Sequence, residues 1–218
     1  MNFRLVLAGF LLLAIGCREV EQPQPIGKDY FPIAVGNEWV YSIDSIFYDG
    51  FNEKRDSFRY YRREVVTEVF ESDGGEQRFS ADVFFKTDST DWKYKSTFTL
   101  YKNDYRGVRI TNNNQIMHLL FPVKNKVSWD ANQLNAMRED RFRYLSSELH
   151  RTSLADSFPA AIFVEHEYDS TVIDADIRWE LYAENTGLVE KKTLSTTTQF
   201  NKTDGFQYHW KLISFTSQ

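Results

Sequence analysis

The stretch WKYKSTFTL, residues 92–100, alternates large apolar side chains with lysine and threonine. Successive side chains of a β-strand point to opposite faces of the sheet, so a period of two directs one set toward a core and the other toward water. The pattern predicts a half-buried strand of an antiparallel sheet. The row expected to face the core consists of Trp92, Tyr94, Ser96, Phe98 and Leu100.

The same alternation appears in QRFSADVFF, residues 77–85, and in FQYHWKLI, residues 206–213. Clusters of turn-forming residues at 72–75, 88–91, 103–104 and 112–114 separate strands at hairpin distances. The best helical candidate, DRFRYLSSELHRTS at 140–153, is too short to cover so many strands. A sheet with one apolar face must then cover itself. The sequence predicts a mainly β fold, an antiparallel meander forming a curved sheet, half-barrel or barrel-like single domain.

Two segments of the chain echo each other. FPIAVGNEW at 31–39 and FPVKNKVSW at 121–129 share phenylalanine, proline and tryptophan at the same spacing. Either an internal duplication or two similar loops that lead into strands would produce this echo.

The N-terminus carries the only cysteine of the chain, Cys17. The apolar run at 5–15 is too short to span a bilayer as a helix, but its length is typical of a secretory signal. Its end, Ala14-Ile15-Gly16-Cys17, resembles the lipobox of bacterial lipoproteins, and this resemblance implies that Cys17 becomes the acylated N-terminus of the mature protein. An ordinary export signal that leaves one free thiol is the alternative.

The segment after Cys17 is polar and contains two prolines, which is typical of an extended spacer. We therefore expect a signal peptide at 1–16, the lipidated cysteine and a flexible tether at 17–29, and a single antiparallel β domain at 30–218. Two or more acyl chains hold a protein stably to a bilayer. The expected location is the bacterial cell envelope, in the outer membrane, with the membrane bound through acylated Cys17.

Two further segments carry a family resemblance. YFPIAVGNEWVY at 30–41 and YAENTGLVEKK at 182–192 are similar to corresponding segments of uncharacterised envelope lipoproteins of Bacteroidota. The resemblance implies an envelope lipoprotein, and it implies no activity.

The charge balance argues against nucleic acid as a partner. The formal net charge is −5 at pH 7, whereas phosphate backbones are bound by clustered lysine and arginine. One basic cluster, FRYYRREV at 58–65, places its arginines on both faces of a predicted strand, where we expect a solvated, salt-bridged surface.

The sequence contains none of the common catalytic or metal motifs: no glycine-rich phosphate loop, GxSxG, HExxH or CxxC. In FVEHEYDST, residues 163–171, strand alternation places Glu165, Glu167 and Asp169 on one face and His166 on the other, which splits any site there. We predict no catalytic residue, no metal and no cofactor. Of the other histidines, we expect His118 to be satisfied within a half-buried core, and His150 and His209 to lie at the surface.

Two classes of function remain open. The first is a monomeric, non-enzymatic module that binds an unknown envelope ligand or protein, and the lack of catalytic motifs favours it. The second is a hydrolase on the exported side whose acids, such as Glu165 or Glu180, meet only in the fold. The candidate ligand-lining residues are Trp92, Tyr94, Phe98, Tyr208 and Trp210. The same rings could simply fill a core, and an open interior cavity would separate the two interpretations.

Overall fold

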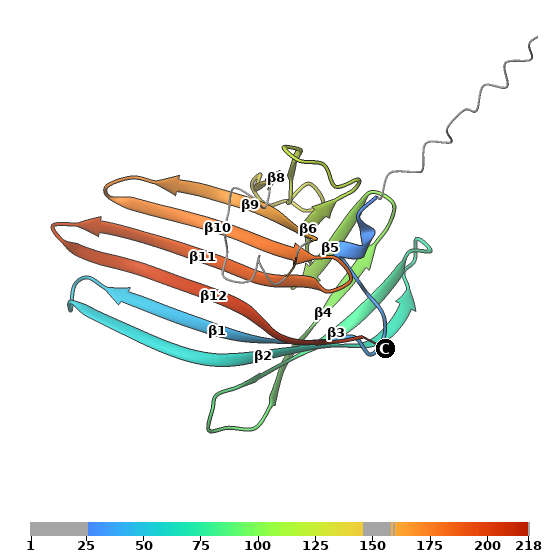
Figure 1. The fold of residues 1–218 in the computed structure, drawn as a ribbon, viewed down its shortest axis with the longest axis horizontal. Coiled ribbons are helices and arrows are strands. Elements are labelled where there is room, and N and C mark those ends of the chain that lie inside the picture. The colour runs from blue at the N-terminus through green and yellow to red at the C-terminus, as the bar shows by residue number, and fades with distance from the viewer. Residues whose placement is uncertain (1–25, 146–157, 159, 218) are drawn as a thin grey trace, which may run out of the picture.

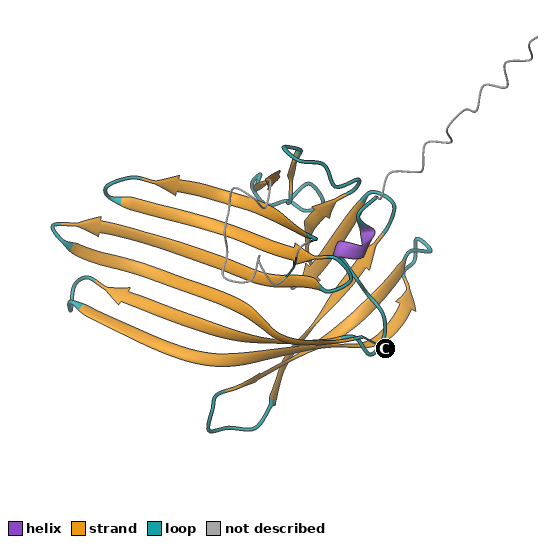
Figure 2. Cartoon of the chain, viewed as in Figure 1, coloured by secondary structure: helices purple, strands orange, loops and turns teal. Residues whose placement is uncertain are grey.

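The computed structural model describes residues 26–145, 158 and 160–217, and they form one twelve-stranded antiparallel sheet (Figure 1, Figure 2). This confirms the predicted mainly β, barrel-like single domain. The described helical structure is one short 3-10 turn, η1 at Lys28–Tyr30. Within these residues no helix is long and apolar enough to cross a membrane. Cys17 and the predicted signal peptide lie outside the described residues.

The strands run up and down in chain order, in two groups of six. The first group is β1 (Glu38–Asp49), β2 (Lys54–Glu71), β3 (Gln77–Lys86), β4 (Lys93–Lys102), β5 (Arg106–Thr111) and β6 (Asn114–Leu120). The second group is β7 (Ser128–Asp130), β8 (Arg141–Leu145), β9 (Ala161–Ser170), β10 (Asp174–Ala183), β11 (Gly187–Gln199) and β12 (Lys202–Thr216). The helical candidate at 140–153 is therefore strand β8 over its first part, and its remainder lies outside the described residues.

The sheet closes almost completely on itself. Strands β1 and β12 pair, so the two groups form a continuous order from β6 through β1 and β12 to β7. The free edges β6 and β7 then meet: Trp129 Nε1 donates to the carbonyl oxygen of Met117 at 2.8 Å, and Met117 N donates to the carbonyl oxygen of Ala131 at 2.9 Å. This closure gives the sheet a concave inner face that no second layer needs to cover.

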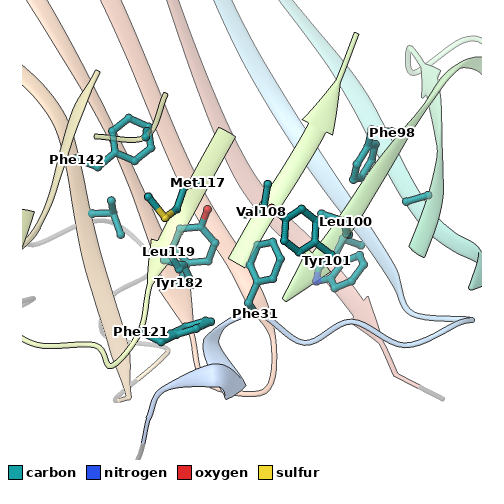
Figure 3. Close-up of a cluster of buried hydrophobic side chains, with 14 of the residues drawn as sticks. Phe31, Phe98, Leu100, Tyr101, Val108, Met117, Leu119, Phe121, Phe142 and Tyr182 are labelled. Atoms are coloured by element: carbon teal, nitrogen blue, oxygen red, sulfur yellow. The ribbon is translucent and has the colours of Figure 1, made fainter. Parts of the chain in front are cut away.

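The main hydrophobic core lies largely on the inner face, and part of it is shown in Figure 3. On β1, Trp39, Tyr41 and Ile43 are buried, whereas the residues between them are only partly buried. The expected inward row of β12 is confirmed by its pairing with this strand, since Trp210 lies opposite Ile43 and Tyr208 opposite Ser45. A smaller apolar cluster lies on the other face of β10, around Phe163, Leu181, Ala183 and Val189.

A β-bulge overturns part of the predicted row in WKYKSTFTL. Phe98 and Leu100 are buried as expected. The pairing of β3 with β4 then shifts between Val83 and Phe84, so Tyr94 lies beside Phe84 on the outer face and is 59% exposed. An extra residue in one strand reverses the facing of every residue beyond it. Trp92 precedes β4 and lies on the same outer side, with the Lys86 Nζ 5.0 Å from its ring centroid.

The two echoing segments form the same local structure. In the first, Asn37 N donates to Ala34 O, and Gly36 has a positive φ of 91°. In the second, Val127 N donates to Lys124 O, and Lys126 has a positive φ of 64°. Each turn also pairs with the second strand of its own group, at Val66 of β2 and at Tyr144 of β8. The echo therefore marks two equivalent entry loops, each at the head of a six-strand group.

Candidate ligand cavity

The inner face surrounds a cavity of about 370 Å³. This volume lies near the lower end of the ~300–1,000 Å³ range of small-molecule sites. The apolar part of its wall comes from strands far apart in the sequence. It includes Trp39, Tyr41, Phe98, Leu100, Ile116, Phe142, Leu188 and Trp210.

One side of the cavity holds an ion pair built on Glu64 of β2. The Glu64 carboxylate accepts from Arg62 at 2.7 Å and from Arg109 of β5 at 2.9 Å. The guanidinium carbon of Arg109 lies 3.5 Å from the Phe98 ring centroid, and that of Arg62 lies 5.0 Å from the Trp210 ring centroid. Burial alone would raise the pKa of Glu64, but the two guanidiniums outweigh it and lower the pKa to about 2. Glu64 is therefore ionised at neutral pH.

A second buried carboxylate, Glu180 of β10, stands at the centre of four side chains. Lys191 Nζ donates to its Oε1 at 2.8 Å, and the Tyr182 hydroxyl donates to Oε2 at 2.7 Å. His118 Nδ1 lies 2.9 Å and His166 Nε2 lies 3.3 Å from the same Oε2. Burial acts to raise the pKa of Glu180, but Lys191 and the two imidazoles hold it well below its ordinary value.

Tyr41 lies between the two ion clusters. Its hydroxyl donates to the carbonyl oxygen of Leu188 at 3.0 Å. Burial raises the pKa of Tyr41 well above its ordinary value, and both Glu64 and Glu180 act on it in the same direction. Both carboxylates are thus close enough to the Tyr41 hydroxyl to raise its pKa, so the two clusters are neighbours in the cavity wall.

The cavity adjoins a shallower hollow of about 620 Å³ at β8 to β10. Asp140, His166 and Arg178 line both spaces. Arg178 donates to Asp140 at 2.9 Å and to Glu167 at 3.1 Å, so an ion-pair network lies where the two spaces meet.

The five candidate ligand-lining residues separate into three groups. Phe98 and Trp210 line the cavity. Tyr208 lies on the same face as Trp210, two residues before it on β12, and forms an edge contact with Phe47 at 5.8 Å between ring centroids. Trp92 and Tyr94 lie on the outer face, away from the cavity wall, because of the bulge in the β3–β4 pairing. A ligand-binding role for the inward residues stays a prediction.

The acids considered for a hydrolase do not come together. Glu180 points into the cavity, whereas Glu165 pairs with Trp179 on the outer face and accepts from Arg143 at 2.8 Å. The pairing of β9 with β10 contains a second bulge, since Arg178 lies opposite Glu167 but the next residue, Trp179, lies opposite Glu165. Glu165 and Glu167 therefore face opposite sides of the sheet, and the prediction that they share one face is wrong.

The histidines show what the tertiary fold adds to the sequence pattern. His118 is satisfied, as expected, but by a carboxylate 62 residues away in the chain. His166 stacks on Phe142, with 3.5 Å between ring centroids. His209, expected at the surface, has a 23% exposed side chain and lies 2.7 Å from the buried Glu190. His150 lies outside the described residues. In the described part of the chain, no group of three or more His, Cys, Asp or Glu residues is arranged to hold a metal ion.

Sequence reasoning missed Glu64, Arg109 and Lys191 as cavity residues. The arginines of FRYYRREV do divide between the faces, since Arg59 and Arg63 pair with Asp44 and Glu38 outside. Arg62, however, is not on a solvated surface, because its side chain is only 13% exposed. The sequence did contain one sign of this site. Arg62 and Glu64 alternate with the outward residues of β2 and so belong to the same inward row as the apolar Tyr60 and Val66.

No family model matches the chain, and no curated protein matches it. Among solved structures, it is similar to a protein described as a lipoprotein from Parabacteroides distasonis, with 14% identity and a TM-score of 0.45 over 89% of this chain and 100% of that one. It is also similar to a protein described as exported, with a YmcC-like fold, from Bacteroides fragilis, with 11% identity and a TM-score of 0.43 over 86% of this chain and 98% of that one.

Proposed function

We propose that this protein is a membrane-anchored envelope lipoprotein whose barrel-like domain binds a small, largely apolar ligand and does not turn it over. The observation that carries this proposal is the cavity of about 370 Å³ on the inner face. Packed cores leave few voids larger than a water molecule, so a space of this size is more than core packing requires.

The wall of the cavity favours an apolar ligand body over a stacked sugar. The rings of Phe98 and Phe142 are covered by Arg109 and His166, each at 3.5 Å from the ring centroid. Trp210 carries the Arg62 guanidinium in the same way. These groups already occupy ring faces on which a sugar would stack, and aliphatic side chains such as Leu100 and Ile116 supply much of the remaining surface.

The anchor of the proposed lipoprotein is acylated Cys17. The apolar run that ends at this cysteine and the proline-containing segment after it support this assignment. Attachment to the outer membrane and a monomeric state belong to the same proposal.

Titration with the neutral fluorescent probe N-phenyl-1-naphthylamine tests the cavity. The protein for this test is the mature polypeptide with Cys17→Ala, which carries no acyl chains. We expect saturable binding that weakens at least tenfold in Ile116→Trp, because the indole fills the cavity. The control Tyr94→Trp adds the same group on the outer face, where Tyr94 is 59% exposed, and should bind as the parent does.

Two results would overturn the proposal. One is the absence of saturable probe binding by a polypeptide that melts cooperatively. The other is turnover of an envelope ester or glycoside that is abolished by Glu180→Gln or by Glu165→Gln.

A further inference from the structure

We propose that the cavity selects an amphiphile with one anionic head group, held by Lys191 and Arg109, with its apolar body against the aromatic wall. This inference rests on the proposed binding function and adds the ligand's chemical class.

The carboxylates of the wall are already engaged, Asp140 by Arg178. Glu180 receives Lys191 on one oxygen and both Tyr182 and His118 on the other. Glu64 receives both Arg62 and Arg109. The wall therefore has little acceptor capacity left for a ligand that brings a donor.

The cations of the wall, in contrast, have N–H donors that are not used in hydrogen bonds to the two buried carboxylates. An ammonium has three N–H donors, and Lys191 gives one to Glu180. A guanidinium has five, and Arg109 directs two to Glu64, at 2.9 and 3.4 Å. The group that complements this surplus is an acceptor.

The balance of charge agrees with the balance of donors. The lining acids Glu64, Asp140 and Glu180 are matched by three lining cations, Arg109, Arg178 and Lys191. Arg178 is also paired with Glu167, so the positive excess does not lie there. It lies at the Glu64 cluster, where two guanidiniums, those of Arg62 and Arg109, share one carboxylate. An anion is thus attracted to this side of the cavity, in a chain whose net charge is −5.

The positive groups converge on one region. Lys191 Nζ and the Arg62 guanidinium carbon lie 5.8 and 5.0 Å from the centroid of the Trp210 ring. Arg109 is close enough to Tyr41 and Tyr182 for its charge to act to lower the pKa of both phenols. Tyr182 is the phenol that donates to Glu180. The head group would lie near these phenols, while its apolar body extends along Trp39, Leu100 and Ile116.

Three ligands that share one chain and differ in head-group charge test the proposal: dodecanoate, dodecanol and dodecylammonium. Each displaces N-phenyl-1-naphthylamine from the mature Cys17→Ala polypeptide, and dodecyl phosphate is added to distinguish a carboxylate from a phosphate preference. We expect an anion to bind at least about tenfold more tightly than dodecanol, since a hydrogen bond to a charged group is stronger than one between neutral groups. Dodecylammonium should bind more weakly than dodecanol.

The matched variants are Lys191→Met and Lys192→Met. They remove the same charge from adjacent positions of β11, but Lys192 pairs with Trp179 and His209 on the outer face. Lys191→Met should remove most of the preference for the anion over dodecanol, whereas Lys192→Met should leave that preference as it is in the parent. Thermal melting of each variant checks that it is folded, and the comparison of ligands in the parent protein requires no variant.

The outcomes separate the inference from the function on which it rests. Equal binding of dodecanoate, dodecyl phosphate and dodecanol would overturn the anion site while leaving the apolar cavity intact. A preference that survives in Lys191→Met would overturn the assignment to Lys191. Failure of all four ligands to displace the probe, or of the probe to bind, would overturn the proposed function itself.

Discussion

Replacement of Glu64 by glutamine removes the carboxylate from a buried ion pair and leaves both of its arginines in place. The Glu64 side chain is 7% exposed, and those of Arg62 and Arg109 are 13% and 22% exposed. Breaking a buried pair by removing one partner costs about 3–5 kcal/mol, because the remaining charge is left uncompensated. We expect a loss of this size in the free energy of unfolding of Glu64→Gln at pH 7.

The pH dependence of this loss follows from the pKa of Glu64. In the folded protein the pKa is lowered from 4.5 to about 2. At about 1.4 kcal/mol per pKa unit, ionised Glu64 contributes about 3 kcal/mol to stability. Because the folded pKa is depressed, this contribution is complete above pH 4.5 and is lost as the pH falls through about 2. About 2 kcal/mol of it should be gone by pH 3.

The assay is urea unfolding of the parent and of Glu64→Gln between pH 7 and pH 3, followed by far-ultraviolet circular dichroism. The difference between the two proteins isolates Glu64 from the other acids, and it should shrink by about 2 kcal/mol at the acidic end. Glu38→Gln is the control, because Glu38 pairs with Arg63 in a partly exposed position that should contribute at most about 1 kcal/mol. A difference for Glu64→Gln that is constant with pH would refute the ion pair as the source of this stability.

Three further predictions concern the fold and the anchor. Trp39→Ala should lower stability by about 3–5 kcal/mol in thermal or urea unfolding, because Trp39 is 6% exposed and its Nε1 donates to Thr186 O at 2.6 Å; an unchanged midpoint would contradict its placement. Tyr94→Ala, in the same assay, should change stability by less than about 1 kcal/mol, whereas a loss as large as that of Trp39→Ala would place Tyr94 back in the core. Metabolic labelling with a fatty acid should mark the parent protein and not Cys17→Ala, and equal labelling of the two would exclude acylation at Cys17.

Strand alternation predicted the mainly β architecture well, because a period of two reflects burial directly. It predicted the inward row of β12, and it failed at Tyr94 and at Glu167. Both failures lie beyond a β-bulge, where one extra residue reverses the facing of the side chains. Nothing in the composition of these segments marks the extra residue.

The cavity could not be predicted in the same way. Arg109 reaches Glu64 across 45 residues, and His118 reaches Glu180 across 62. Such pairs depend on which strands become neighbours or face each other across the interior, and local periodicity does not contain that information. The pairing of β1 with β12 and the meeting of β6 with β7 bring these side chains together.

The most direct test of the central claim, that the interior of the sheet is a ligand site, is a crystal structure of the mature Cys17→Ala polypeptide grown with dodecanoate. We expect electron density for the acyl chain between Trp39, Phe142 and Trp210, with the carboxylate at Lys191. An interior filled by rearranged side chains, with dodecanoate absent or bound only on the outer face, would contradict the account.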